Sequence, residues 1–133
     1  MNEVINQLYA RKSVRVFEDR EIRLEEKTAI LNAAVQAPTA GNQQLYTILD
    51  ITDRNLKNQL AETCDHQPFI AAAKMVLIFC ADCRKWYEAF RAADCNPRDP
   101  GVGDLMLAVT DAVIAAQNAV VAAESLGIGS CYI

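Results

Sequence analysis

Two arginines and a lysine surround one hydroxyl near the start of the chain: Arg11, Lys12, Ser13 and Arg15. In an extended segment residues 11, 13 and 15 share one face, because side chains alternate between the two faces of the backbone. Two guanidinium groups beside a hydroxyl suit a phosphate, which accepts charge-assisted, bidentate hydrogen bonds. The alternative is a solvated surface in which cations at a helix end complement the helix dipole.

A polar loop offers a second group of candidate ligands. It follows Pro38 and presents one hydroxyl and two amides, from Thr39, Asn42 and Gln44. Gly41 allows the loop backbone to adopt φ angles that other residues avoid. Amides and hydroxyls can pair with the donors and acceptors of a heterocycle. The alternative is a loop that only satisfies its own backbone groups.

The last seven residues, Gly127 to Ile133, form the third candidate segment. Its two glycines would allow the backbone to approach a flat ligand closely. The alternative is a helix C-cap followed by a tight turn.

The elements that would position these segments alternate between helices and strands. The patterns predict helices over 2–11, 24–37, 54–64, 84–93 and 104–126, a helical turn over 69–73, and strands over 45–52, 75–80 and from 128 onward. Asn2 and Asp53 are the expected N-caps of two of the helices. This order predicts a single α/β domain over 1–133, with a mixed central sheet and helices on both sides.

The helix over 104–126 is the expected centre of the fold. It has no proline or glycine, and its apolar side chains point all round, which is typical of a helix that is buried on most sides. Asp104, Asp111, Gln117, Asn118 and Glu124 argue against a lipid bilayer. Its many alanines would allow another helix to approach closely, and we expect a second subunit to provide part of its cover.

Composition excludes several classes of protein. The net charge of −4 argues against nucleic-acid binding. Neither a secretory signal nor a membrane-spanning run is evident, and five cysteines with no signal favour free thiols in the cytoplasm. Cys80 and Cys83 form a lone CxxC, which is a weak metal signal beside a single histidine, His66. Because the chain ends inside an apolar run, we expect it to lack its C-terminal part.

Taken together and in order, the three motifs resemble the nitroreductase family of FMN-dependent oxidoreductases. The matching stretches are RKSVR, APTAGNQQ and AAQNAVVAAESLGIGSCYI. Family members often continue the second motif with Pro-Trp, where this chain has Leu45 and Tyr46, and they continue beyond the third.

The resemblance implies a role for each motif. Arg11, Ser13 and Arg15, with Lys12 beside them, match positions that hold the FMN phosphate and ribityl chain. The loop residues Pro38, Thr39 and Asn42, with Gln44 in the same motif, match the segment that packs near the isoalloxazine, usually from the partner subunit. The backbone of Cys131, Tyr132 and Ile133 matches the strand that passes the flavin. The family forms homodimers with long helices at the interface and FMN between the subunits.

The resemblance also implies an activity. FMN would take hydride from NADH or NADPH and reduce a nitroaromatic or quinone acceptor in a ping-pong reaction, with no catalytic side chain and no metal. Three alternatives stay open. They are flavin fragmentation or reductive dehalogenation on the same fold, a non-catalytic flavin-binding or redox-sensing protein, and a dimeric structural module without a cofactor.

Overall fold

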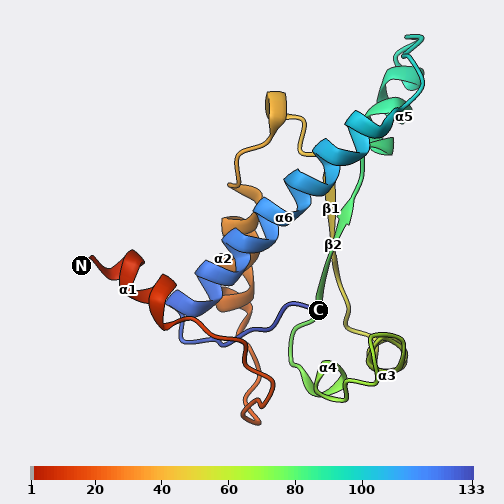
Figure 1. Cartoon of the computed structure of the whole chain (residues 1–133). Coiled ribbons are helices and arrows are strands. Elements are labelled where there is room, and N and C mark those ends of the chain that lie inside the picture. The colour runs from red at the N-terminus through yellow and green to blue at the C-terminus, as the bar shows by residue number, and fades with distance from the viewer. Residues whose placement is uncertain (1) are drawn as a thin grey trace.

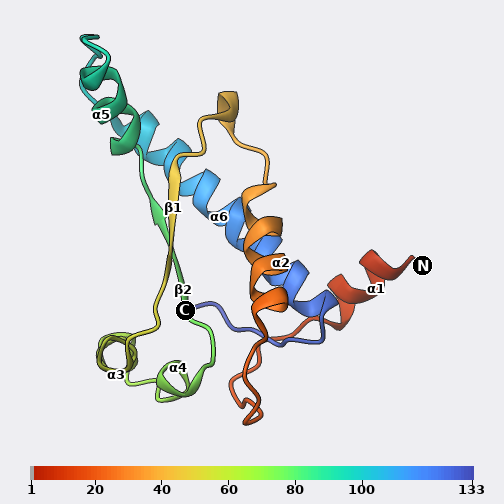
Figure 2. The same cartoon turned by 180° about the vertical axis from the view of Figure 1, so that it is seen from behind.

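The computed structural model describes residues 2–133, and the long helix α6 (Val102–Ser125) is the element against which two other helices and both strands pack (Figure 1). The elements before it are α1 (Glu3–Ala10), α2 (Leu24–Val35), the 3-10 turn η1 (Ala40–Asn42), β1 (Tyr46–Asp50), α3 (Arg54–Thr63), α4 (Phe69–Ala72), β2 (Leu77–Ala81) and α5 (Arg84–Ala92). Figure 2 shows that α2 and the two strands lie on the same side of α6. The side chains of Asn2 and Asp53 cap α1 and α3, as predicted.

A stripe of alanines on α6 forms the core. The buried members are Ala108, Ala112, Ala115, Ala116, Ala119 and Ala123. Ile30 and Ala34 of α2 pack against the C-terminal half of this stripe, together with Phe79 of β2. Because alanine has the smallest apolar side chain, the stripe lets α2 and the sheet come close to the helix axis. The predicted central helix is confirmed.

The opposite face of α6 is apolar but exposed. Its side chains include Leu105, Met106, Val109 and Val113, of which Met106 is 66% and Val113 is 59% exposed. By length and composition α6 could also cross a membrane, with a mean hydropathy of 1.7 over 18 residues. Core helices of globular proteins pass the same test, and the packed alanine stripe with a buried Asp111 shows that α6 is such a core helix.

The sheet is smaller than predicted. β1 and β2 pair antiparallel, with Ile48 opposite Phe79, and both of these side chains face the core around α6. The predicted strand from 128 onward is wrong within the described residues, where it is reduced to one parallel bridge between Ser13 and Ser130. A strand needs neighbours along its length, and here the backbone meets only residues 13 and 14. Helix α6 packs against both strands of this sheet.

Glu26, in the first turn of α2, is one of two carboxylates that are buried among the described residues. Its side chain is 7% exposed and accepts from the backbone N–H of Arg23 at 2.9 Å, the Arg23 guanidinium at 2.9 Å and the Arg20 guanidinium at 3.1 Å. The Arg23 bonds, followed by the Arg20 contact, lower the pKa of Glu26 to about 2 against the opposing effect of burial.

We expect the stabilisation from Glu26 to depend on pH. A pKa lower in the folded chain than its ordinary value of 4.5 stabilises the fold above that value, and the contribution disappears as the pH falls toward 2. Urea unfolding should therefore show Glu26→Gln to be less stable than the wild type near neutral pH, with the difference closing near about pH 2. The exposed neighbour Glu25→Gln is the control. A difference for Glu26→Gln that stays constant over this range would contradict the assignment.

Candidate functional site

The cationic segment lies directly beside the glycine-containing tail. Gly127 has φ 73 and ends α6 as its C′ residue, as expected, and the chain then turns back toward residues 13 and 14. Val14 donates its backbone N–H to the carbonyl of Ser130 at 2.9 Å. A Cβ on Gly129 would lie 2.7 Å from Cγ2 of Val14, so this approach requires glycine. The first and third predicted motifs therefore meet in space.

Residues 11, 13 and 15 share one face, as the alternation predicted. A cavity of about 920 Å³ lies between this segment, α4, β2, α6 and the tail, and it is lined by Lys12, Val14 and Val16 but not by Arg11, Ser13 or Arg15. Cys131, Tyr132 and Ile133 also line the cavity. Lys12 thus points to the opposite side from the two arginines.

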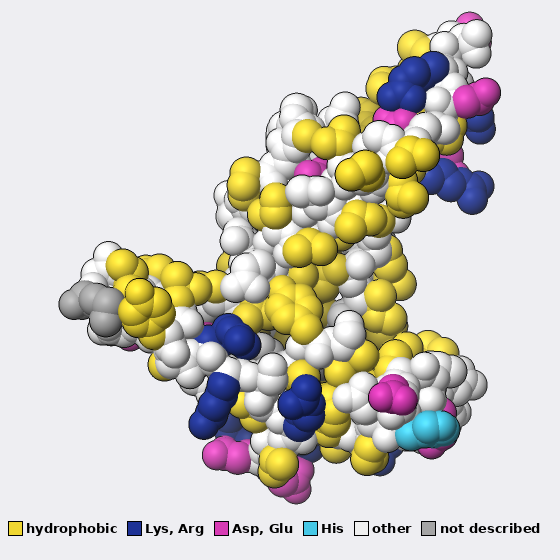
Figure 3. Space-filling model, in the orientation of Figure 1, with side chains coloured by type: hydrophobic (Ala, Val, Ile, Leu, Met, Phe, Trp, Pro, Cys, Tyr) yellow, Lys and Arg dark blue, Asp and Glu magenta, His cyan; other side chains and the backbone are white. Residues whose placement is uncertain are grey.

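The cations of this segment have no carboxylate partner among residues 2–133. Within residues 2–133 no carboxylate forms an ion pair with Arg11, Lys12 or Arg15, although other cations, such as Arg20, Lys27 and Lys74, do pair. Figure 3 shows Lys and Arg side chains gathered below the C-terminal end of α6. In an acidic chain, a cluster of unpaired cations indicates a local site for an anion.

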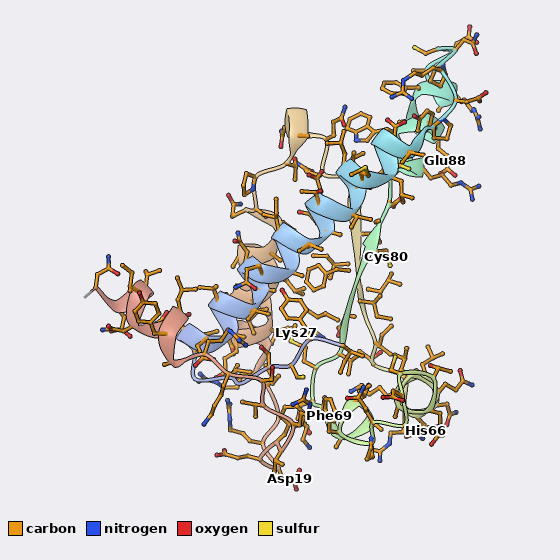
Figure 4. All side chains as sticks on the ribbon, in the orientation of Figure 1. Asp19, Lys27, His66, Phe69, Cys80 and Glu88 are labelled. Atoms are coloured by element: carbon orange, nitrogen blue, oxygen red, sulfur yellow. The ribbon has the colours of Figure 1, made fainter. Side chains whose placement is uncertain are left out.

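An aromatic ring lies beside Arg15. The guanidinium of Arg15 lies 5.8 Å from the ring centroid of Phe69, which Figure 4 labels at the start of α4. Partial burial raises the pKa of Tyr132, and the positive charge of Arg11 opposes this rise. The Tyr132 hydroxyl donates to Oε1 of Gln117 on α6 at 3.3 Å.

The polar loop after Pro38 is held in an unusual backbone conformation. Gly41, Asn42 and Gln44 have φ values of 58, 55 and 53. A non-glycine residue in this left-handed region costs on the order of 1 kcal/mol or more, and such strain gathers at functional sites. The conformation displays the exposed side chains of Asn42 and Gln44 at the tip of the loop.

Part of the loop satisfies itself, as the alternative reading predicted. The Thr39 hydroxyl accepts from the backbone N–H of Gln44 at 3.2 Å, and the Gln44 amide donates to Oδ1 of Asn42 at 2.9 Å. Thr39 is therefore a brace within the loop, which leaves Asn42 and Gln44 to offer groups to a ligand.

Two anchors of the loop were missed in the sequence. Trp86 of α5 donates its indole N–H to the carbonyl of Gln43 at 2.6 Å. The buried carboxylate of Asp111 on α6 accepts from the backbone N–H groups of Ala40 at 3.4 Å and Leu45 at 3.1 Å. The available signal for Asp111 was a carboxylate in the middle of an apolar helix, whereas nothing marks Trp86 in the sequence.

Within one chain the two halves of the predicted site are far apart. The loop of Pro38, Thr39, Asn42 and Gln44 packs near Asp111, about four helical turns before the end of α6, or about 20 Å at 1.5 Å per residue. Arg11, Lys12, Ser13 and Arg15 lie with the tail at that end. Figure 1 shows the loop beside the N-terminal half of α6, whereas the segment that follows α1 runs near the C-terminal end of α6.

The other sequence candidates lie apart from both halves. His66 follows α3 at the edge of the molecule in Figure 4, with its Nδ1 2.8 Å from the carboxylate of Glu62. No cluster of metal-binding side chains occurs in the part of the chain that the structure describes.

We expect Gly129→Ala to destabilise the contact between the tail and the cationic segment. The added methyl would overlap the Val14 side chain, and overpacking of this kind costs about 1–3 kcal/mol of unfolding free energy. Chemical denaturation measures this loss. Gly103→Ala on α6 is the matched control, because no atom lies within 4 Å of its added Cβ. Equal stability of the two variants would contradict the close approach.

Comparison with known proteins gives the same family over nearly the whole chain. The model of the nitroreductase family matches residues 8–133. The chain is 33% identical to the FMN reductase [NAD(P)H] of Bacillus subtilis, over 98% of this chain and 53% of that protein. It is also 33% identical to the oxygen-insensitive NADPH nitroreductase of Salmonella typhimurium, over 100% of this chain and 54% of that protein.

Solved structures show the same fold. The structure of B. megaterium NfrA2 superposes with a TM-score of 0.92 at 34% identity, covering 97% of this chain and 53% of that one. The NADPH:FMN oxidoreductase from Vibrio harveyi, complexed with NAD+, gives a TM-score of 0.90 at 27% identity, covering 96% and 54%. The chain belongs to the nitroreductase family and has its mixed α/β fold. It spans about half the length of these relatives.

Proposed function

We propose that the protein is an FMN-dependent oxidoreductase that takes hydride from NADH or NADPH and reduces a nitroaromatic or quinone-type acceptor in a ping-pong reaction. The relatives named as FMN reductase and NADPH nitroreductase support this class of activity. A cytoplasmic location fits the free cysteines and the family.

The observation that carries the proposal is the group of unpaired cations beside the tail. Arg11 and Arg15 share one face with the Ser13 hydroxyl, and no carboxylate in residues 2–133 pairs with either guanidinium. This donor set has the charge and the hydrogen-bond donors that a phosphate monoester needs. The residues therefore fit the phosphate end of FMN, with Lys12 beside them as a more distant positive charge.

A homodimer would complete the site. In one chain the loop with Asn42 and Gln44 is about 20 Å along α6 from the cationic segment, too far for one flavin to contact both. The exposed apolar face of α6, including Met106 and Val113, is the surface that a second copy would cover. Two copies related by a two-fold axis would bring the loop of one to the cations of the other.

Bound FMN would supply the hydride chemistry, so the side chains need only bind and orient the reactants. Arg11 and Arg15 neutralise phosphate, Ser13 donates a hydrogen bond, and the backbone of Cys131, Tyr132 and Ile133 borders the ring system. Asn42 and Gln44 would present amide groups from the partner, on the loop that starts at Pro38 and that Thr39 braces.

Turnover with several acceptors tests the proposed activity. The purified full-length protein, supplied with FMN, should oxidise NADH or NADPH steadily when a nitroaromatic or a quinone is present, with parallel double-reciprocal lines. Bound FMN without turnover would instead favour a flavin-binding or sensing protein. Consumption of the flavin itself, or release of halide from a halogenated aromatic, would favour the other chemistries of the fold.

A further inference from the structure

We infer that Asp111 is a positioning residue, which sets the conformation of the loop over residues 39–45 from inside the protein. The inference rests on the proposed function, because the loop is the part of the site that would face the flavin of the partner subunit. Asp111 itself is buried, with only 2% of its surface exposed. Its effect on the reaction would pass through the loop backbone.

The carboxylate joins the two ends of the loop. One oxygen of Asp111 accepts from the N–H of Ala40 at 3.4 Å, and the other accepts from the N–H of Leu45 at 3.1 Å. Between these two points lie the left-handed residues Gly41, Asn42 and Gln44. A single side chain therefore sets the distance between the two ends of the strained turn.

An ionised carboxylate suits this position better than any other side chain of its size. It offers two acceptor oxygens and no donor, whereas an amide offers one oxygen and would direct its NH2 group at a backbone N–H. Within residues 2–133 no cation forms an ion pair with Asp111, so backbone N–H groups provide its hydrogen bonds. Burial of a charge is costly, and a hydrophobic residue would serve the alanine core of α6 better.

The charge also affects the first residue of β1. Burial raises the pKa of the Tyr46 phenol, and the negative charge of Asp111 raises it further. On the outer side the indole of Trp86 holds the carbonyl of Gln43. The loop is thus fixed from the core by Asp111 and from α5 by Trp86, and its Asn42 and Gln44 side chains are aimed as a unit.

Hydrogen exchange of the cofactor-free protein tests the anchor without any flavin. Asp111→Asn keeps the size of the side chain but removes the second acceptor, so we expect exchange in peptides covering residues 39–46 to rise about tenfold or more. Asp104→Asn is the matched control. It is the same substitution on the same helix, and Asp104 accepts from Arg98 and the N–H of Gly101. Asp104→Asn should lower thermal stability without faster exchange in the loop.

FMN-loaded protein tests the consequence for the site. In Asp111→Asn we expect the visible circular dichroism of bound FMN to change and the affinity for FMN to fall about tenfold. Asp104→Asn should keep the wild-type dichroism and affinity. A loosened loop with unchanged dichroism and affinity would overturn the positioning role. A wild-type protein that binds no FMN but shows the exchange result would instead refute the proposed function and leave the anchor standing.

The wild-type protein provides the test if Asp111→Asn does not fold. Residues 39–46 should then exchange more slowly than the exposed connection over residues 95–101, which precedes α6. Equal exchange of the two segments would overturn the anchor.

Discussion

Replacing Arg11 or Arg15 with alanine should weaken FMN binding by about 10- to 100-fold in each case. A hydrogen bond to a charged group contributes about 1.5–3 kcal/mol, and about 1.4 kcal/mol corresponds to a factor of ten in affinity. Neither arginine has an ion-pair partner within residues 2–133, so each guanidinium is available to a phosphate. Fluorescence titration with FMN measures the change.

Lys12→Ala and Arg84→Ala are the controls for this prediction. Lys12 lies on the opposite face of the segment and lines the apolar cavity, so its loss should weaken FMN binding by less than either arginine. Arg84 is an exposed arginine that pairs with Glu88 on α5, and its loss should leave the affinity unchanged. Binding should also weaken with added salt. FMN affinity equal to wild type in both Arg11→Ala and Arg15→Ala would refute the phosphate site.

Two variants, each defective in a different half of the site, should restore activity when their subunits are mixed at an FMN concentration that saturates the wild type but not Arg11→Ala. Arg11→Ala disables the cationic half of a site, and the double variant Asn42→Ala with Gln44→Ala disables the loop half. If each site takes its halves from different subunits, a mixed dimer has one intact site and one with both defects. Random mixing makes half of the dimers mixed, so activity should return to about one quarter of the wild-type value.

Refolding the two variants together, with each refolded alone as the control, performs this test. A quarter of the wild-type activity in the mixture, against little in either variant alone, would establish a site built from two subunits. Activity in the mixture no higher than the average of the two variants would show that each site is built within one chain. The separation of the loop and the cations along α6 would then need another explanation.

The helices could be predicted from the sequence because their signals are local. Asn2 and Asp53 cap their helices as predicted. The long helix starts two residues before its predicted start, at Val102, where Gly101 donates to Asp104, and it ends one residue early, at Ser125. The strand at the end of the chain could not be predicted correctly. Apolar residues from 128 onward suit a strand, but pairing depends on which backbone lies alongside, and only residues 13 and 14 do.

The site could be predicted only in part. The alternation of residues 11, 13 and 15 follows from the geometry of an extended backbone, and the structure shows it. The contact of this segment with Ser130 could not be deduced from spacing, since it depends on how the chain turns after Gly127. Asp111 was visible in the sequence as a carboxylate in an apolar helix, but its partners Ala40 and Leu45 lie far away in the chain.

The central claim is that this protein binds FMN and reduces it with a nicotinamide. The most direct test is the visible absorption spectrum of the purified full-length protein, recorded under argon before and after addition of NADPH, and in parallel NADH. We expect two flavin bands that bleach on addition of at least one nucleotide. Flavin bands that neither nucleotide bleaches would contradict the reductase function. Protein that stays colourless after incubation with FMN would contradict the phosphate site at Arg11, Ser13 and Arg15.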